Sequence, residues 1–294
     1  MTTTQGTAHE HSRTAAPKGV LRPSWRGRAQ REGAPMSIQA LIFDVDGTLA
    51  DTEEAHRVAF NLAFERHRLG WTWSRTEYRG LLAVHGGKER IASFIQSLPL
   101  GEAWRQRLRA GIPAIHADKT KFYVSLVRDG GVPLRDGAAR LLAEAQGAGC
   151  RLAIASGTTA DNVTALLQAA LGARGMAMFS VIACGDQVQA KKPAPDIYQL
   201  ALRRLGLRAD CAVAFEDSPN GLRAATAAGL WTVVTPTCWT DGGDFSAAGL
   251  LLPRLGDPWY PLAAEPGLAL STQAWLKFDE LQLHARAANR SRSH

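Results

Sequence analysis

The chain has 294 residues, 46% of them hydrophobic, which is enough for one large domain or two modest ones, each with its own core. Its net charge of +7 resides in the two ends, +4 in residues 1–36 and +3 in residues 281–294, and the neutral stretch between them argues against a nucleic-acid-binding face. The four cysteines form no CxxC pair, which argues against a zinc site and favours a reducing cytosol, and no apolar run approaches the ~20 residues of a membrane span.

Residues 1–36 are rich in Thr, Gly, Pro, Arg and Ala and show no apolar periodicity. We therefore expect a disordered basic extension. The segment has no continuous apolar stretch of the kind that secretory signals contain. A transit peptide and an alternative start at Met36 both stay open.

Short apolar runs alternate with helical patterns from residue 38 onward. The runs that read as buried strands are residues 38–43, 151–155, 181–184, 211–215 and 232–234. Helical patterns over residues 136–148, 196–205 and 219–228 lie between the later ones. This alternation predicts an α/β core domain with a doubly wound, mostly parallel, Rossmann-like sheet, formed by residues 37–52 and 133–280.

Residues 53–132 interrupt that rhythm. Helix-like segments occur near residues 53–68, 75–83, 88–97, 102–110 and 114–128. We expect an all-helical cap domain inserted after the first strand, over the carboxyl end of the sheet, where α/β proteins bind their ligands. At the other end of the chain, residues 281–294 are expected to form a disordered basic tail.

Two carboxylates, Asp44 and Asp46, follow directly on the first predicted strand. Residues two apart on an extended chain face the same way, so both can project from the strand end. Gly47 permits a tight turn after them. A DxD pair alone is weak evidence, because a polar exit from a strand has the same pattern.

Three further polar segments follow later strands. Residues 156–158, Ser-Gly-Thr, could hold a phosphate, a lysine of the pair Lys191 and Lys192 could neutralise it, and Glu216-Asp217 supplies the oxygens that Mg²⁺ prefers. Singly, each has an ordinary alternative: a helix cap, a solvated lysine pair, or acids favoured by a helix dipole. Their arrival at one edge of one sheet indicates a common site.

These motifs resemble, in order and spacing, the four motifs of the haloacid dehalogenase superfamily, over about residues 38–240. The helical insertion resembles the cap of its β-phosphoglucomutase-like branch. Within that branch the chain is most similar to the CbbY-type xylulose-1,5-bisphosphate phosphatases, which are linked to the Calvin cycle. That likeness rests on residues 43–49, 51–57, 86–91, 119–120, 192–198 and 216–222.

The resemblance implies the roles of the core residues. Asp44 would attack phosphorus and form an aspartyl-phosphate, and Asp46 would serve as general acid and base. Ser156 and Lys192 would hold the phosphoryl oxygens, Lys192 being preferred to Lys191 because it directly precedes Pro193. The metal ligands implied for Mg²⁺ are Asp44, the backbone carbonyl of Asp46, and Asp217, with Glu216 nearby.

The resemblance also implies substrate-binding residues in the cap and the second motif. They are Glu53, His56, Tyr78, Gly86, Gly87, Lys88, Arg90, Lys119, Gly157 and Thr158. Several cations opposite the core site would suit a substrate with a second phosphate. One departure is Gly157, which stands where many relatives carry Thr or Ala, so the stiffness of this loop is expected to differ.

The function implied is a Mg²⁺-dependent phosphatase of carbohydrate metabolism that hydrolyses a sugar phosphate, with xylulose 1,5-bisphosphate as the example. We expect a cytoplasmic monomer with a small-molecule substrate and no nucleic-acid or membrane partner. A β-phosphoglucomutase-type mutase and a non-catalytic binding or regulatory protein stay open as alternatives. A dehalogenase is disfavoured, because its chemistry needs neither Asp46 nor a metal.

Overall fold

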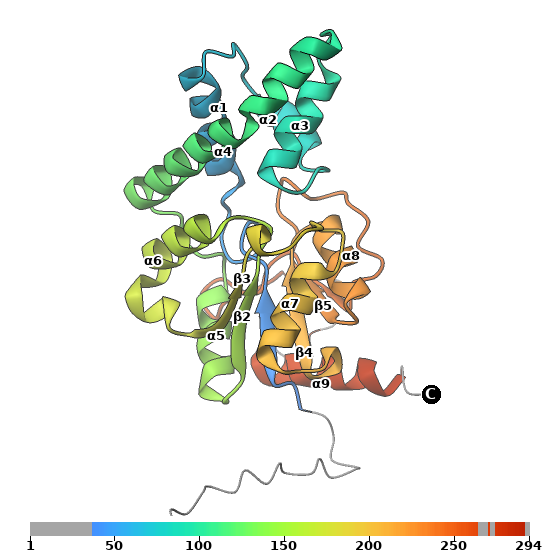
Figure 1. The fold of residues 1–294 in the computed structure, drawn as a ribbon. Coiled ribbons are helices and arrows are strands. Elements are labelled where there is room, and N and C mark those ends of the chain that lie inside the picture. Colours follow the sequence, from blue (N-terminus) through green and yellow to red (C-terminus); the bar gives the residue numbers. More distant parts are fainter. Residues whose placement is uncertain (1–36, 264–269, 271–273, 292–294) are drawn as a thin grey trace, which may run out of the picture. The chain divides into compact units, whose positions relative to one another are not determined.

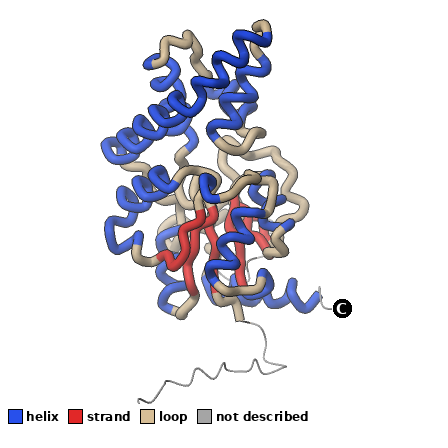
Figure 2. The backbone as a smooth tube through the Cα atoms, viewed as in Figure 1, coloured by secondary structure: helices blue, strands red, loops and turns tan. Residues whose placement is uncertain are grey.

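A parallel sheet of six strands forms the centre of the core (Figures 1 and 2). The computed structural model describes residues 37–263, 270 and 274–291, so the expectation for residues 1–36 lies outside the described residues. The strands run in the order β3-β2-β1-β4-β5-β6. Their bounds are β1 Ala40–Phe43, β2 Arg151–Ala155, β3 Phe179–Ala183, β4 Ala212–Glu216, β5 Trp231–Val234 and β6 Leu250–Leu251.

Strand β1 carries large side chains on one face and a smaller set on the other. Leu41 and Phe43 belong to one hydrophobic cluster, whereas Ala40 and Ile42 belong to a second one. Helices α5, Ala138–Gly147, and α6, Ala160–Met176, cover the first face, and α7, Asp196–Leu205, and α8, Pro219–Ala227, cover the second. Helices on both faces of a parallel sheet confirm the predicted fold class.

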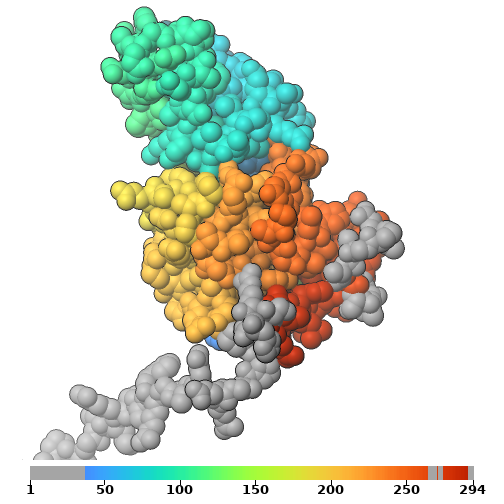
Figure 3. Space-filling view, turned by 90° about the vertical axis from the view of Figure 1, so that its right-hand side faces the viewer, coloured from blue at the N-terminus to red at the C-terminus, as the bar shows by residue number. Residues whose placement is uncertain are grey.

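Four helices between β1 and β2 form the cap, at the end of the sheet where β1 stops (Figure 1). They are α1 Glu53–Arg66, α2 Arg75–Leu81, α3 Gly87–Ser97 and α4 Glu102–Gly130. Their shared core is aromatic, with Phe60, Phe64, Trp73 and Tyr78 all buried. Figure 3 shows these helices resting on segments of the core drawn in yellow and orange.

One long helix replaces two that the sequence predicts. Segments 102–110 and 114–128 belong to the continuous helix α4, which contains Pro113. A proline inside a helix removes one backbone hydrogen bond and normally breaks or kinks it. Burial of Ile112 and Ile115 on either side of it stabilises the helix in compensation. Helix α6 and strand β6 are further elements that the sequence did not predict.

The expectation of a disordered tail at residues 281–294 is wrong for most of its length. Helix α9, Phe278–Ser291, occupies this segment, and residues 292–294 lie outside the described part of the chain. Leu281 and Ala285 are buried in the cluster beneath the sheet. A positive charge on the outer side of this helix obscured the apolar spacing of its inner side.

Within residues 37–263 and 274–291, no helix combines the length and the apolar character that crossing a membrane requires.

Candidate active site

The first predicted carboxylate, Asp44, lies directly beyond the end of β1 and is buried. Nζ of Lys192 donates a hydrogen bond to its Oδ1 at 2.7 Å. Nζ also donates to Oε1 of Glu216, which accepts from the Tyr198 hydroxyl as well. Lys191 instead donates to the carbonyl oxygens of Gly185 and Val188. The structure thus pairs Lys192, and not Lys191, with the predicted nucleophile.

Three carboxylates converge at this point. Oxygens of Asp44, Glu216 and Asp217 all lie within 4.8 Å of one another. Burial, together with the other two carboxylates, raises the pKa of Asp217 well above its usual range, and no described group donates a hydrogen bond to its side chain. Burial also raises the pKa of Asp44, although Lys192 opposes the shift. A set of hard oxygens with one nearby lysine fits a divalent cation such as Mg²⁺.

The second carboxylate, Asp46, is held by two residues at the start of the cap. Oδ1 of Asp46 accepts hydrogen bonds from Oγ1 of Thr52 at 2.5 Å and from Nε2 of His56 at 2.9 Å. Burial raises the pKa of Asp46, but His56, Thr52 and Lys119 outweigh it and bring the pKa down to about 2. The contacts therefore favour the ionised form, which is the form that accepts a proton.

A lysine from α4 completes this chain of contacts. Nζ of Lys119 lies 2.6 Å from Nδ1 of His56. Burial, and then the positive charge of Lys119, lower the pKa of His56, so the imidazole is neutral and its Nδ1 accepts from the lysine. Burial likewise lowers the pKa of Lys119 to about 7. The bonding pattern puts the proton of His56 on Nε2, facing Asp46.

The second motif forms a tight loop after β2. Ser156 is fully buried, its N–H donates to the carbonyl oxygen of Ala183, and its Oγ accepts from the N–H of Thr158 at 3.2 Å. Oγ1 of Thr158 accepts from Nδ2 of Asn162. The Ser156 hydroxyl thus stabilises the loop, while Gly157 and Thr158 line the cavity described below.

Three of the predicted cap residues form one polar cluster. The hydroxyl of Tyr78 donates to Glu53 at 2.8 Å and accepts from Nη1 of Arg90 at the same distance. Arg90 also lies over the Tyr78 ring. Since Tyr78 is fully buried, its role in this geometry is to orient Glu53 and Arg90, which do reach the cavity.

A cavity of about 620 Å³ connects the core and cap residues. Most of the predicted site residues line it: Asp44, Asp46, Glu53, His56, Gly86, Gly87, Lys88, Arg90, Lys119, Gly157, Thr158 and Asp217. Four others lie behind its wall: Tyr78, Ser156, Lys192 and Glu216. Tyr78, Ser156 and Lys192 each bond a residue that lines the cavity. Glu216 bonds Lys192.

The two glycines before α3 serve different purposes. Gly86 has a φ of 95°, which other residues rarely adopt. A Cβ atom on Gly87 would lie 2.6 Å from Nε2 of His116, so this glycine makes room for that histidine. Both glycines line the cavity, as the sequence predicts for substrate-binding residues, and Gly87 also leaves room for the side chain of His116.

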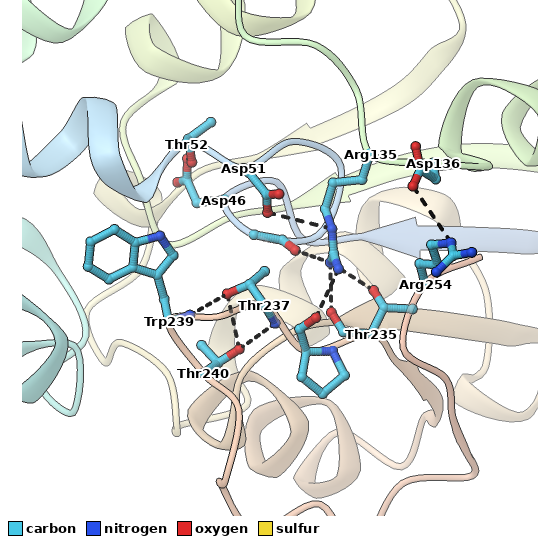
Figure 4. Close-up of polar contacts among 12 residues, drawn as sticks. Asp46, Asp51, Thr52, Arg135, Asp136, Thr235, Thr237, Trp239, Thr240 and Arg254 are labelled. Carbon is cyan, nitrogen blue, oxygen red and sulfur yellow. Dashed lines mark hydrogen bonds and ion pairs between the residues drawn. The ribbon is translucent and has the colours of Figure 1, made fainter. Parts of the chain in front are cut away.

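Two structural residues of the site were not predicted. Arg135 donates hydrogen bonds to the carbonyl oxygens of Gly47, Thr235 and Pro236, which joins the loops after β1 and β5 (Figure 4). Trp239 comes from the core segment after β5 yet packs in the aromatic core of the cap, edge-on to Tyr78. Their partners are distant in sequence, so no local pattern indicates either role.

Comparison with known proteins agrees with this geometry. Residues 38–229 match the family of haloacid dehalogenase-like hydrolases. The CbbY protein of Cupriavidus necator is 52% identical over 233 residues, which make up 79% of this chain and 92% of that protein. A crystal structure of a CbbY variant from Rhodobacter sphaeroides in complex with xylulose-(1,5)bisphosphate is 48% identical, with a TM-score of 0.68 over 74% of this chain and 94% of that one.

A β-phosphoglucomutase from Clostridium difficile shares the fold, with a TM-score of 0.63 over 86% of this chain and 99% of that one, at 19% identity. The family match covers every segment that borders the cavity at Asp44 apart from the loop after β5. The chain therefore belongs to the haloacid dehalogenase-like hydrolases, close to the CbbY proteins.

Proposed function

We propose that this enzyme is a Mg²⁺-dependent phosphatase that hydrolyses a sugar bisphosphate, such as xylulose 1,5-bisphosphate, through an aspartyl-phosphate on Asp44. One observation carries the proposal: Lys88, Arg90 and Lys119 of the cap line the same cavity as Asp44 and Asp46. One phosphate at Asp44 leaves cations on the opposite wall for a second. The relative that holds xylulose-(1,5)bisphosphate supports the same substrate class.

The core residues would carry out two displacements. In the first, an oxygen of Asp44 attacks phosphorus, the bond to the sugar oxygen breaks, and that oxygen takes a proton from Asp46. In the second, water attacks phosphorus of the phosphoaspartate and gives a proton to Asp46. The bond between phosphorus and Asp44 breaks, which releases phosphate and restores the Asp44 carboxylate. Lys192 balances charge on the carboxylate and the transferred group. Asp44, Asp217 and the Asp46 carbonyl would hold Mg²⁺, which neutralises phosphoryl charge.

Asp46 must hold a proton before the first displacement, although its contacts favour the ionised form. A bound phosphate brings negative charge close to Asp46 and so raises its pKa. Substrate binding itself would then prepare the acid form, and the second displacement would begin from the free base. This order makes proton uptake part of substrate binding.

A mutase is the second candidate, because the same phosphoaspartate could pass its phosphoryl group to a sugar hydroxyl. The relatives at 52% and 48% identity favour the phosphatase, whereas the mutase at 19% identity supports only the fold.

A cytoplasmic location, a monomeric state and the boundaries 37–52 with 133–280 for the core and 53–132 for the cap stay predictions. Sedimentation velocity tests the monomer.

The test incubates purified enzyme and Mg²⁺ with xylulose 1,5-bisphosphate and, separately, with β-glucose 1-phosphate. We expect one phosphate released per xylulose bisphosphate and little from the glucose phosphate. Isomerised glucose phosphate without free phosphate would overturn the phosphatase. Asp44→Asn is expected to abolish release, with Asp129→Asn, an exposed site on α4, as the control. Release that survives in Asp44→Asn would overturn the covalent mechanism.

A further inference from the structure

His85, in the loop between α2 and α3, reaches from the cap to the loop of the second motif, residues 156–158, which we call the phosphate loop. Its imidazole lies against Gly157, where a Cβ atom would be 1.9 Å from Nε2 and 2.7 Å from Cδ2 of His85. No side chain at position 157 fits while the imidazole occupies this space. Gly157 is the residue that departs from the usual second motif, and the imidazole of His85 occupies the space that a side chain at this position would need.

The core loop has no room to retreat from His85. A Cβ atom on Gly185 would lie 2.1 Å from the carbonyl oxygen of Gly157, so the backbone just after β3 supports the loop from behind. The N–H of Gly185 also donates to the carbonyl oxygen of Thr158 at 2.8 Å. A side chain at position 157 would thus displace the imidazole of His85 rather than the core loop.

The imidazole itself is free to meet a ligand. It lines the same cavity as Asp44 and Lys119, and neither ring nitrogen has a hydrogen-bond partner among residues 37–263, 270 and 274–291. Burial, and then the positive charge of Lys192, lower the pKa of His85 to about 3, so it stays neutral. A neutral imidazole can press against the phosphate loop without adding a charge that must be desolvated.

The loop of His85 touches the core at a second point. Nδ2 of Asn220, in the first turn of α8, donates to the carbonyl oxygen of Ala83 at 2.9 Å. Two contacts, one on each side of Val84, therefore attach this loop to the core. Lys88, in the first turn of α3, follows His85 by three residues and depends on the same attachment.

We propose that His85 is a positioning residue whose imidazole interlocks with Gly157 and sets the closed position of the cap over Asp44. The proposal rests on the proposed function for its effect on turnover, but not for the interlock itself. When His85 is seated against Gly157, the loop that carries Gly86, Gly87 and Lys88 is held over the phosphate loop. If position 157 holds a larger residue, position 85 must hold a smaller one for the cap to come equally close to the core.

The experiment is a double-mutant cycle of His85→Ala, Gly157→Thr and the pair. Gly157→Thr is expected to lower kcat/KM for xylulose 1,5-bisphosphate on the order of 10- to 100-fold, because a displaced cap misplaces the bound substrate. His85→Ala removes the obstruction, so the double variant should recover to within about 3-fold of His85→Ala, which is strong non-additivity. Gly147→Thr, where a side chain meets nothing within 4 Å, is the matched control.

A small substrate separates cap positioning from damage to the phosphate loop. Hydrolysis of p-nitrophenyl phosphate, which has no second phosphate for the cap cations to bind, should change little in Gly157→Thr. Loss of both activities without rescue in the double variant would overturn the interlock, as would full bisphosphatase activity in Gly157→Thr. Either result would mean that position 157 acts within the core alone.

Hydrogen exchange gives a readout that does not depend on turnover. The amides of residues 83–87 should exchange faster in Gly157→Thr than in the unmodified enzyme and return in the double variant to the rate of His85→Ala. An unchanged rate in Gly157→Thr would overturn the proposal. An unmodified enzyme that shows the expected exchange but hydrolyses no sugar phosphate would overturn the proposed function and leave the interlock supported.

Discussion

Nζ of Lys119 on α4 lies 2.6 Å from Nδ1 of His56 on α1, and Nε2 of the same imidazole bonds Asp46. Helices α1 and α4 of the cap are thereby linked to a carboxylate of the core. The His56 ring also stacks on Tyr123 of α4, with 4.0 Å between ring centroids. The tautomer and the tilt of one imidazole are thus both set by α4.

Lys119→Met should lower kcat on the order of 100-fold, because the donor that fixes the His56 tautomer is lost and Asp46 loses its oriented proton partner. In the unmodified enzyme, the Lys119 pKa of about 7 predicts a fall in kcat as pH rises past 7, if the ammonium is the required donor. The pH profile of kcat measures both effects. Lys121→Met, at a lysine that is 75% exposed on the same helix, is the control and should retain full activity.

Asp217→Asn should stabilise the metal-free protein and weaken its response to Mg²⁺. The raised pKa of Asp217 means that ionisation is costly in the folded state, so stability falls as pH rises above the unfolded value of about 4. Removing that charge should raise the free energy of unfolding by about 1–2 kcal/mol at pH 8. Thermal melts with and without Mg²⁺ measure both changes, since a ligand that binds only the folded state raises Tm.

The control for this experiment is again Asp129→Asn, whose melts should match the unmodified protein at every Mg²⁺ concentration. An Asp217→Asn protein that is less stable without metal would contradict the repulsion among the three carboxylates. An undiminished shift with Mg²⁺ would contradict its assignment as a ligand.

Arg135→Met should destabilise the fold by about 2–4 kcal/mol, because three loop carbonyl oxygens lose a charged donor at once. Urea denaturation measures the free energy of unfolding. The control is Arg208→Met, at an arginine whose side chain is 77% exposed and bonds, within the described part of the chain, only Asp210. Equal stability of the two variants would show that Arg135 does not join the loops after β1 and β5.

Trp239→Ala should raise KM for the bisphosphate several-fold and lower the free energy of unfolding by about 3 kcal/mol. The indole is 8% exposed, packs on Tyr78 and lies beneath the guanidinium of Arg75. Its loss removes one of the apolar contacts between the core and the cap. Trp104→Ala, at a tryptophan that is 59% exposed, should change neither quantity, and a similar effect of both substitutions would contradict the contact.

The predictions from sequence succeeded where short-range patterns determine structure. Strand β1 and the position of Asp44 followed from one apolar run, and helix α7 was predicted with the bounds that the structure shows. The choice of Lys192 over Lys191 came from the resemblance, and the contact with Asp44 agrees with it. Local patterns and motif order therefore sufficed for the framework, and most of the site residues that they indicated do line the cavity.

Packing between distant segments accounts for what was missed. Trp239 and Arg135 contact residues more than 80 positions away in the sequence. His85 can pack against position 157 only because Gly157 has no side chain. Helix α9 was not predicted, because the positive charge of residues 281–294 indicates a solvated tail, whereas Leu281 is buried in the core. The roles of Trp239, Arg135 and His85 leave no periodic signal in a single sequence, whereas the inner side of α9 does.

The place of β1 in the sheet has a consequence for how the enzyme loses activity. Two strands separate β1 from one edge and three from the other, since the order is β3-β2-β1-β4-β5-β6. Interior strands exchange their amide hydrogens only when the whole domain opens, whereas loops and peripheral helices open locally. Mild denaturant should therefore abolish hydrolysis of the bisphosphate by loosening the cap. The backbone amides of β1, next to Asp44, should stay protected from hydrogen exchange until global unfolding.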